Sequence, residues 1–259
     1  IVTARRRDEL LQDVPISMTV FNQQQLDNNN VVNSSDLARF TPSLSVNQRF
    51  GSENSSFAIR GFTQELRTTA SVGTYFAEVV APRGANSQTS GDGAGPGSFF
   101  DLENVQVLKG PQGTLFGRNT TGGAINFITR KPALEGTNGT LTAGYGNFNR
   151  INFAGALEFT PVADKVGIRV AGTFVDSDPY VKNRLAAGNN TFAAFGLSGL
   201  NRNTGIQPGG TKTYGIRGTI RVKPSDGVDL MLKGYAAKSK GGTETPLPTG
   251  QSKTSDNLN

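Results

Sequence analysis

Alternating apolar and polar residues organise the second half of the chain. Five segments after residue 132 follow a period of two, the period with which successive side chains of a β-strand point to opposite faces of a sheet. The pattern predicts five strands of about 10 residues, each with one apolar face and one polar or charged face. The apolar faces comprise Leu141, Ala143 and Tyr145; Ile151, Phe153, Gly155, Leu157 and Phe159; Val166, Ile168, Val170, Gly172 and Phe174; Tyr214, Ile216, Gly218, Ile220 and Val222; and Val228, Leu230 and Leu232.

A soluble β-sandwich and a transmembrane β-barrel share this alternation, and the pattern alone does not separate them. The connections favour the barrel, because residues 161–165 and 224–227 are short turns whereas residues 177–212 form a long loop rich in Gly and Asn. Five strands do not close a membrane barrel, whose smallest members have about eight. We therefore expect the N-terminal portion of a longer protein, ending in an external loop after Lys238.

The first half reads as a mixture of short helices and strands. Period-two patterns predict strands from Val14 to Phe21, from Ser43 onward and from Phe57 into a glycine. Residues 22–40 predict helical pieces, with Ser34 or Ser35 as a cap and an end before Pro42. The pattern changes at residues 133–137, where we place a domain boundary.

A glycine-rich connector separates two further strands, Val105 to Leu108 and Ala124 to Thr129. A phosphate-binding loop is excluded, because Lys109 precedes the glycines and β-branched residues stand where a helix should begin. The glycines instead predict tight turns and close approach of neighbouring backbones.

Composition removes several classes of function. The absence of Cys and His excludes disulfides, thiolate metal sites, metal catalysis and a Ser-His triad. Carboxylate chemistry stays open, but no pair of carboxylates stands out, so we expect no enzyme, no metal and no cofactor. The net charge of +6 arises mainly in the second half, and only Arg5, Arg6 and Arg7 cluster, which argues against nucleic-acid binding. No apolar run approaches the 18 or so residues of a membrane helix, so a membrane span must be a strand. The N-terminus lacks signal-peptide features and reads as already processed.

The run LENVQVLKGPQGTLFGRNTTGGAINFITRKP resembles the signature at the end of the plug domain of TonB-dependent outer-membrane receptors, and SSDLARFTPSLSV and FAIRGF are similar to earlier parts of that domain. The resemblance implies an α+β plug over residues 1–132. It also implies that residues 133–259 are the incomplete N-terminal part of a transmembrane β-barrel, which has 22 strands in plugged outer-membrane transporters. The implied location is the bacterial outer membrane, with the plug and N-terminus facing the periplasm and the long loops extracellular.

The resemblance also suggests roles for residues at the plug surface. IVTA is similar to the end of the TonB box, so Ile1, Val2, Thr3 and Ala4 are expected to pair with a strand of TonB, while a frayed arm is the alternative. Arg60, inside an apolar strand, needs a partner if it is buried. Ala77 and Glu78 stand where the family has an Asp-Gly turn, so we expect a differently shaped hairpin. The residues expected to face the barrel wall are Arg60, Lys109 and Arg118.

Three apical loops of the plug are the expected ligand-binding elements, although each of their charges is also compatible with an ordinary solvated loop. Arginines there suit an anionic ligand such as a ferric chelate or an acidic sugar. The expected residues are Arg49 and Phe50 in Gln48–Ser55, Gln64 and Arg67 in Thr63–Thr69, and Arg83 in Arg83–Ser98.

We therefore predict TonB-dependent active transport of a scarce solute, by default a ferric siderophore, across the outer membrane. TonB, outer-membrane lipid and a small-molecule ligand are the expected partners. Uptake of carbohydrate, cobalamin or another non-iron nutrient is the alternative. A passive porin or structural barrel, a signal transducer with an additional domain, and a hydrolase are the competing classes.

Overall fold

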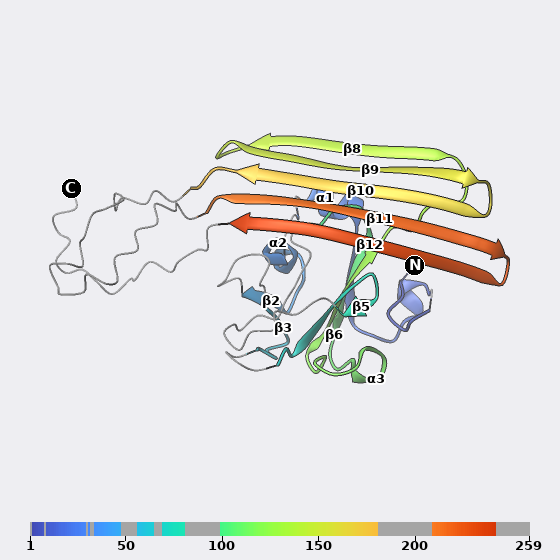
Figure 1. The fold of residues 1–259 in the computed structure, drawn as a ribbon. Coiled ribbons are helices and arrows are strands. Elements are labelled where there is room, and N and C mark those ends of the chain that lie inside the picture. The colour runs from blue at the N-terminus through green and yellow to red at the C-terminus, as the bar shows by residue number, and fades with distance from the viewer. Residues whose placement is uncertain are drawn as a thin grey trace, which may run out of the picture.

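The computed structural model describes residues 2–7, 9–29, 31, 34–47, 56–64, 69–80, 99–180 and 209–241. Figure 1 shows the long strands β8–β12 as one layer, with the shorter elements of the first half against one face of it. We call these two parts the wall sheet and the plug. None of the helices in the described ranges is long and apolar enough to cross a membrane.

The plug contains a five-stranded sheet of order β1-β6-β7-β4-β5 and a two-stranded sheet of β2 and β3. Neighbouring strands are antiparallel, except that β4 and β7 are parallel. Its elements are η1 (Leu11–Asp13), β1 (Met18–Asn22), α1 (Gln23–Asn28), α2 (Ser34–Arg39), β2 (Leu44–Asn47), β3 (Ser56–Ile59), β4 (Val72–Phe76), β5 (Val79–Val80), β6 (Leu102–Lys109), α3 (Gly113–Phe116) and β7 (Gly123–Thr129).

The predicted elements of the plug are present. Asn22 and Gln25 form a capping box that starts α1, since each side chain bonds the backbone N–H of the other. The helix α2 ends at Arg39, before Pro42. In the connector, a Cβ on Gly123 would overlap the carbonyl oxygen of Leu108, so the expected close backbone approach is confirmed there. The short helix α3 in that connector was not predicted.

Two clusters of apolar side chains occupy opposite faces of the plug sheet, because successive residues of β6 and β7 alternate between them. Val105, Val107, Ile125 and Phe127 join the larger cluster, which α1, α2, β2 and β3 cover. The smaller cluster, which we call the N-terminal cluster, contains Val2, Ala4, Val14, Tyr75, Leu108, Phe116 and Ala124.

Two local expectations for the plug are wrong. The strand β3 ends at Ile59, and Arg60 is exposed in the following turn with a φ of 53°, so it does not lie inside an apolar strand. The connection of β4 to β5 is a tight two-residue turn even without Asp-Gly. Ala77 and Glu78 have φ of 51° and 69°, the positive values that a type I′ hairpin turn requires at both central positions.

Because left-handed backbone costs a non-glycine residue about 1–2 kcal/mol, the double variant Ala77→Asn/Glu78→Gly should stabilise the plug. The backbone carbonyl of Glu78, which accepts a bond from Arg6, stays in place. We expect a higher urea midpoint for unfolding of the plug in the full-length protein. An unchanged or lower midpoint for the double variant would show that the turn is not strained.

The wall sheet has the order β12-β11-β10-β9-β8, with each strand antiparallel to the next. All five predicted strands are present and reach 10 to 15 residues. The predicted apolar face points away from the plug, where Leu141, Leu157 and Ile216 are more than half exposed. Arg169 and Arg217 lie on the opposite face and are buried. The strands are β8 (Thr137–Gly146), β9 (Arg150–Val162), β10 (Val166–Ser177), β11 (Thr211–Ser225) and β12 (Val228–Gly241).

Candidate functional site: the interface of plug and wall

The segment Phe99–Asp101 attaches the plug to the wall directly before β6. The ring of Phe99 packs in the larger plug cluster, 5.1 Å from the ring of Phe127. The next side chain, Phe100, is buried against the wall residues Ala156 and Ala171. The neighbouring residues Phe99 and Phe100 thus attach this short segment to the plug and to the wall sheet, respectively.

A buried ion network surrounds the carboxylate of Asp101. Nε of Arg169 on β10 lies 3.1 Å from both carboxylate oxygens, and Nη2 of Arg217 on β11 lies 3.1 Å from Oδ2. Arg169 also donates to Oε2 of Glu158 on β9, at 2.7 Å. All four side chains are nearly inaccessible to solvent. Two carboxylates therefore balance two guanidinium groups, as burial of charge requires.

Arg217 is enclosed by plug atoms as well as by charge. Its Cζ lies 4.9 Å from the ring centre of Phe100 and 5.6 Å from that of Phe76, distances at which a guanidinium is attracted to an aromatic face. Nη2 donates to the backbone carbonyls of Phe100 at 3.2 Å and Asp101 at 2.7 Å. Lysine has one compact ammonium and no planar fork, so it would not replace this set of contacts.

Further contacts hold the end of β7 and the linker that follows. Nζ of Lys233 on β12 donates to Oγ1 of Thr129 at 3.1 Å. Nη1 of Arg221 donates to the carbonyl of Pro132 at 3.4 Å. A Cβ on Gly167 would overlap the carbonyl oxygen of Ala133, so the linker passes close to β10. The wall thus holds the start of β6 and the end of β7, which are neighbours in the plug sheet.

The three residues predicted to face the wall do not form these contacts. The guanidinium of Arg60 lies near Gly110 within the plug, Arg118 is exposed, and Lys109 is half-buried. Across the described ranges, none of the three forms an ion pair with β8–β12. Their role toward other parts of a barrel stays a prediction.

The N-terminal segment is docked on the plug. Val2 forms an antiparallel bridge with Glu9, with N···O distances of 2.8 and 3.0 Å, and Val2 and Ala4 are buried in the N-terminal cluster. A frayed arm is therefore wrong for Val2 to Ala4, while Ile1 lies outside the described residues. Oγ1 of Thr3 is buried and has no hydrogen-bond partner in the described part of the chain.

Three arginines cover this docked segment. Arg5 and Arg7 both form ion pairs with Glu9, and the Arg7 pair measures 2.8 Å. The hydrogen bond from Arg5 lowers the pKa of Glu9, and the same bond raises the pKa of Arg5. Cζ of Arg6 lies 4.8 Å from the ring centre of Phe116, which ties the segment to α3.

Among the residues predicted for the apical loops, Arg49, Phe50, Arg67 and Arg83 lie outside the described residues. Gln64 is described and is half-buried after β3. The described part of the chain has no group of three or more acidic residues placed to hold a metal ion. Binding of a ligand by these loops therefore stays a prediction.

Comparison with known proteins agrees with this geometry. Residues 10–124 match the family model for the TonB-dependent Receptor Plug Domain. The iron-regulated outer membrane virulence protein of Vibrio cholerae serotype O1 is 24% identical over 189 residues, covering 69% of this chain and 28% of that protein. Vitamin B12 transporter BtuB of Vibrio vulnificus is 28% identical over 182 residues, covering 70% and 28%. The ferripyoverdine receptor of the outer membrane of Pseudomonas aeruginosa, solved bound to ferripyoverdine, superposes with a TM-score of 0.64 at 20% identity, covering 92% of this chain and 27% of that one.

The fold is that of a plug domain followed by part of an antiparallel β-barrel. Residues 10–124 carry the plug domain that this family model describes, and the plug predicted from the glycine-rich signature is confirmed there. These relatives are transporters and receptors rather than enzymes. The chain spans 28% of the length of each of the two curated relatives.

Proposed function

We propose that this chain forms the plug, over residues 1–132, and the first part of the barrel, from residue 133, of a TonB-dependent transporter that carries a ferric siderophore across the bacterial outer membrane. The observation that carries the proposal is a plug fixed to the inner face of a wall whose outer face is apolar and exposed. A relative regulated by iron and a neighbour bound to ferripyoverdine support an iron chelate as the substrate.

The two attachments of the plug suggest how force from TonB would act. The N-terminal segment lies in one apolar cluster, whereas Phe99 and Asp101 connect the other cluster to the wall. A pull on residues 1–4 would withdraw Val2 and Ala4 and separate Arg6 from Phe116, while Asp101 held its end of β6 in place. Such a pull would deform the part of the plug between the moving N-terminal segment and the fixed Asp101.

Buried polar groups make the region between these points easier to open. The side-chain oxygens of Gln106 on β6 and Asn126 on β7 are buried without a hydrogen-bond partner in the described residues, and the two residues are paired across the sheet. An unsatisfied buried polar group costs about 1–3 kcal/mol, and water regains that energy when the sheet opens. The β6–β7 pair is thus the part of the plug that we propose to loosen during transport.

Uptake assays with a deletion strain test the proposed substrate. Cells lacking the full-length gene, and the same cells complemented with it, would receive ⁵⁵Fe-labelled siderophores of the hydroxamate, catecholate and mixed-ligand classes under iron limitation. Restoration of proton-gradient-dependent uptake for one class is the expected result. Labelled cobalamin is the comparator, because one relative is a vitamin B12 transporter. Restored cobalamin uptake without iron uptake would mean that cobalamin, and not a siderophore, is the substrate. Uptake that persists without a proton gradient would favour a passive porin.

A further inference from the structure

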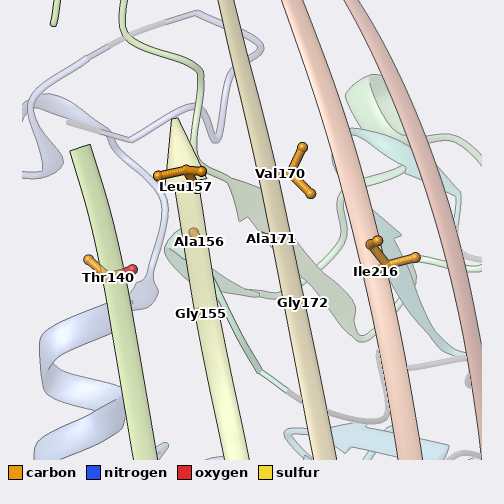
Figure 2. A pocket seen from close by; sticks show the side chains of 8 residues that line it. All are labelled: Thr140, Gly155, Ala156, Leu157, Val170, Ala171, Gly172 and Ile216. Carbon is orange, nitrogen blue, oxygen red and sulfur yellow. The ribbon is translucent and has the colours of Figure 1, made fainter. Parts of the chain in front are cut away.

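A shallow apolar depression lies on the outer face of the wall sheet, away from the plug. Gly155 on β9 and Gly172 on β10 are direct partners across the sheet, and their lack of side chains opens a depression of about 310 Å³. Figure 2 shows the side chains of Leu157, Val170 and Ile216 around the two glycines. The lining is mainly apolar, which suits a hydrocarbon chain.

Aromatic residues and then lysines follow along the same face, toward the end of the sheet that carries the connection from β10 to β11. The strand register aligns Phe153, Phe174, Tyr214 and Lys238 in one row across the sheet. It aligns Ile151, Asp176, Lys212 and Lys240 in a second row. We call Lys212, Lys238 and Lys240 the lysine patch.

The acidic groups near the lysine patch leave it with positive charge. Nζ of Lys212 lies 2.8 Å from Oδ2 of Asp176, so this pair is neutral. Asp178 accepts a hydrogen bond from Asn149, at the β8–β9 side of the sheet. Lys238 and Lys240 are exposed and form no ion pair in the described part of the chain. Two positive charges therefore face outward beside β11.

The spacing between patch and depression matches the division of a lipid into head and tail. Lys212 precedes Ile216 by four residues, or about 13 Å along a strand. With the tilt of about 45° usual in membrane barrels, this becomes about 9 Å along the membrane normal. The headgroup region extends several Å beyond the hydrocarbon, so lysines at phosphate depth place the depression inside the hydrocarbon.

We propose that this face binds one anionic lipid, with its phosphate on the lysine patch and an acyl chain in the depression at Gly155 and Gly172. This inference rests on the proposed function, because it requires the wall to span a membrane. The positive charge of the lysine patch favours an anionic lipid as the occupant. A second copy joined symmetrically would bring like-charged lysines together, whereas a phosphate neutralises them.

The test measures co-purified and added lipid on the full-length protein by native mass spectrometry in detergent. Phosphatidylglycerol and phosphatidylcholine of equal chain length are titrated. Lys238→Gln/Lys240→Gln should reduce the affinity for phosphatidylglycerol about thirtyfold, with phosphatidylcholine unchanged. The control Lys165→Gln/Lys223→Gln removes two lysines from the opposite end of the sheet and should have no effect. Equal affinities of wild type and Lys238→Gln/Lys240→Gln, or an equal loss in the control, would overturn the proposal.

A second pair of variants tests the depression. A Cβ on Gly172 meets only the carbonyl oxygen of Gly215, at an ordinary 3.6 Å, so Gly172→Leu fills the depression without a backbone clash. It should reduce phosphatidylglycerol affinity about tenfold, the equivalent of roughly two methylene contacts. Gly218→Leu is the control, since a Cβ there has open space and Gly218 does not line the depression. Unchanged affinity in Gly172→Leu would rule out the acyl-chain site.

Solute uptake is measured on the same variants to separate this proposal from the transport function. Uptake that continues in Lys238→Gln/Lys240→Gln while lipid affinity falls supports both the lipid site and the transport function. Lipid affinity that follows the predictions in a protein that carries none of the tested solutes overturns only the transport proposal. A mass corresponding to two copies of the protein, retained in Lys238→Gln/Lys240→Gln and lost in Gly172→Leu, would replace the lipid with a second copy.

Discussion

Deletion of Ile1–Ala4 from the full-length protein should abolish proton-gradient-dependent uptake and leave binding of the external ligand intact. Strand addition to TonB requires free backbone groups in this segment, and the deletion removes them. The measurement is accumulation of labelled ligand by energised cells, compared with binding by the same cells after dissipation of the gradient. Uptake equal to that of the wild type would contradict assignment of the TonB box to these residues.

A second variant is needed to test strand pairing alone, because the deletion also removes two buried side chains from the N-terminal cluster. Thr3→Pro removes one backbone N–H and keeps Val2 and Ala4. Its matched control is Thr3→Ala, which retains the N–H and loses only a hydroxyl without a partner in the described residues. We expect uptake to be lost in Thr3→Pro and retained in Thr3→Ala. Equal uptake by both variants would mean that the segment does not pair with a strand.

The hydrophobic pattern was sufficient to predict most of the secondary structure. Period-two alternation identified β8–β12 because each strand has one face toward the plug and one away from it. Successive side chains point to opposite faces, so apolar and polar residues alternate along the strand. The turn at Ala77 and Glu78 was missed for the opposite reason. Neither residue favours positive φ, and the pairing of β4 with β5 imposes that conformation on them.

The contacts between plug and wall could be predicted only in part. The alternation left Arg169, Arg217 and Glu158 on the polar face, opposite the predicted apolar residues. It did not show that Asp101 would meet the two arginines from 68 and 116 residues away in sequence. The resemblance drew attention to cationic plug residues, Arg60, Lys109 and Arg118, as the ones that face the wall. At the described interface the charges are reversed, with the carboxylate on the plug and guanidinium groups on the wall. Such a pairing depends on tertiary distance, which no local pattern encodes.

Replacement of Asp101 by Ala should destabilise the attachment of the plug by about 3–5 kcal/mol, because Arg217 would stay buried without a carboxylate. With a urea dependence of about 1–3 kcal/mol per molar, the midpoint for plug opening should fall by roughly 2 M. Conductance of the full-length protein in planar bilayers at increasing urea concentration measures that midpoint. Asp226→Ala is the matched control, since Asp226 pairs with Lys223 at an exposed site where ion pairs contribute about 0–1 kcal/mol. Similar midpoints for both variants would show that the buried network does not hold the plug.

A double-mutant cycle identifies which charge causes the loss. In Asp101→Ala/Arg217→Met the uncompensated guanidinium is gone, while Arg169 keeps its 2.7 Å pair with Glu158. Arg217→Met alone leaves Asp101 paired with Arg169 and removes the stacking between Phe76 and Phe100. The double variant should therefore lose less stability than the sum of the two single variants, by about 1–3 kcal/mol. A strictly additive result would show that Asp101 and Arg217 contribute independently, so that their charge pair does not hold the plug.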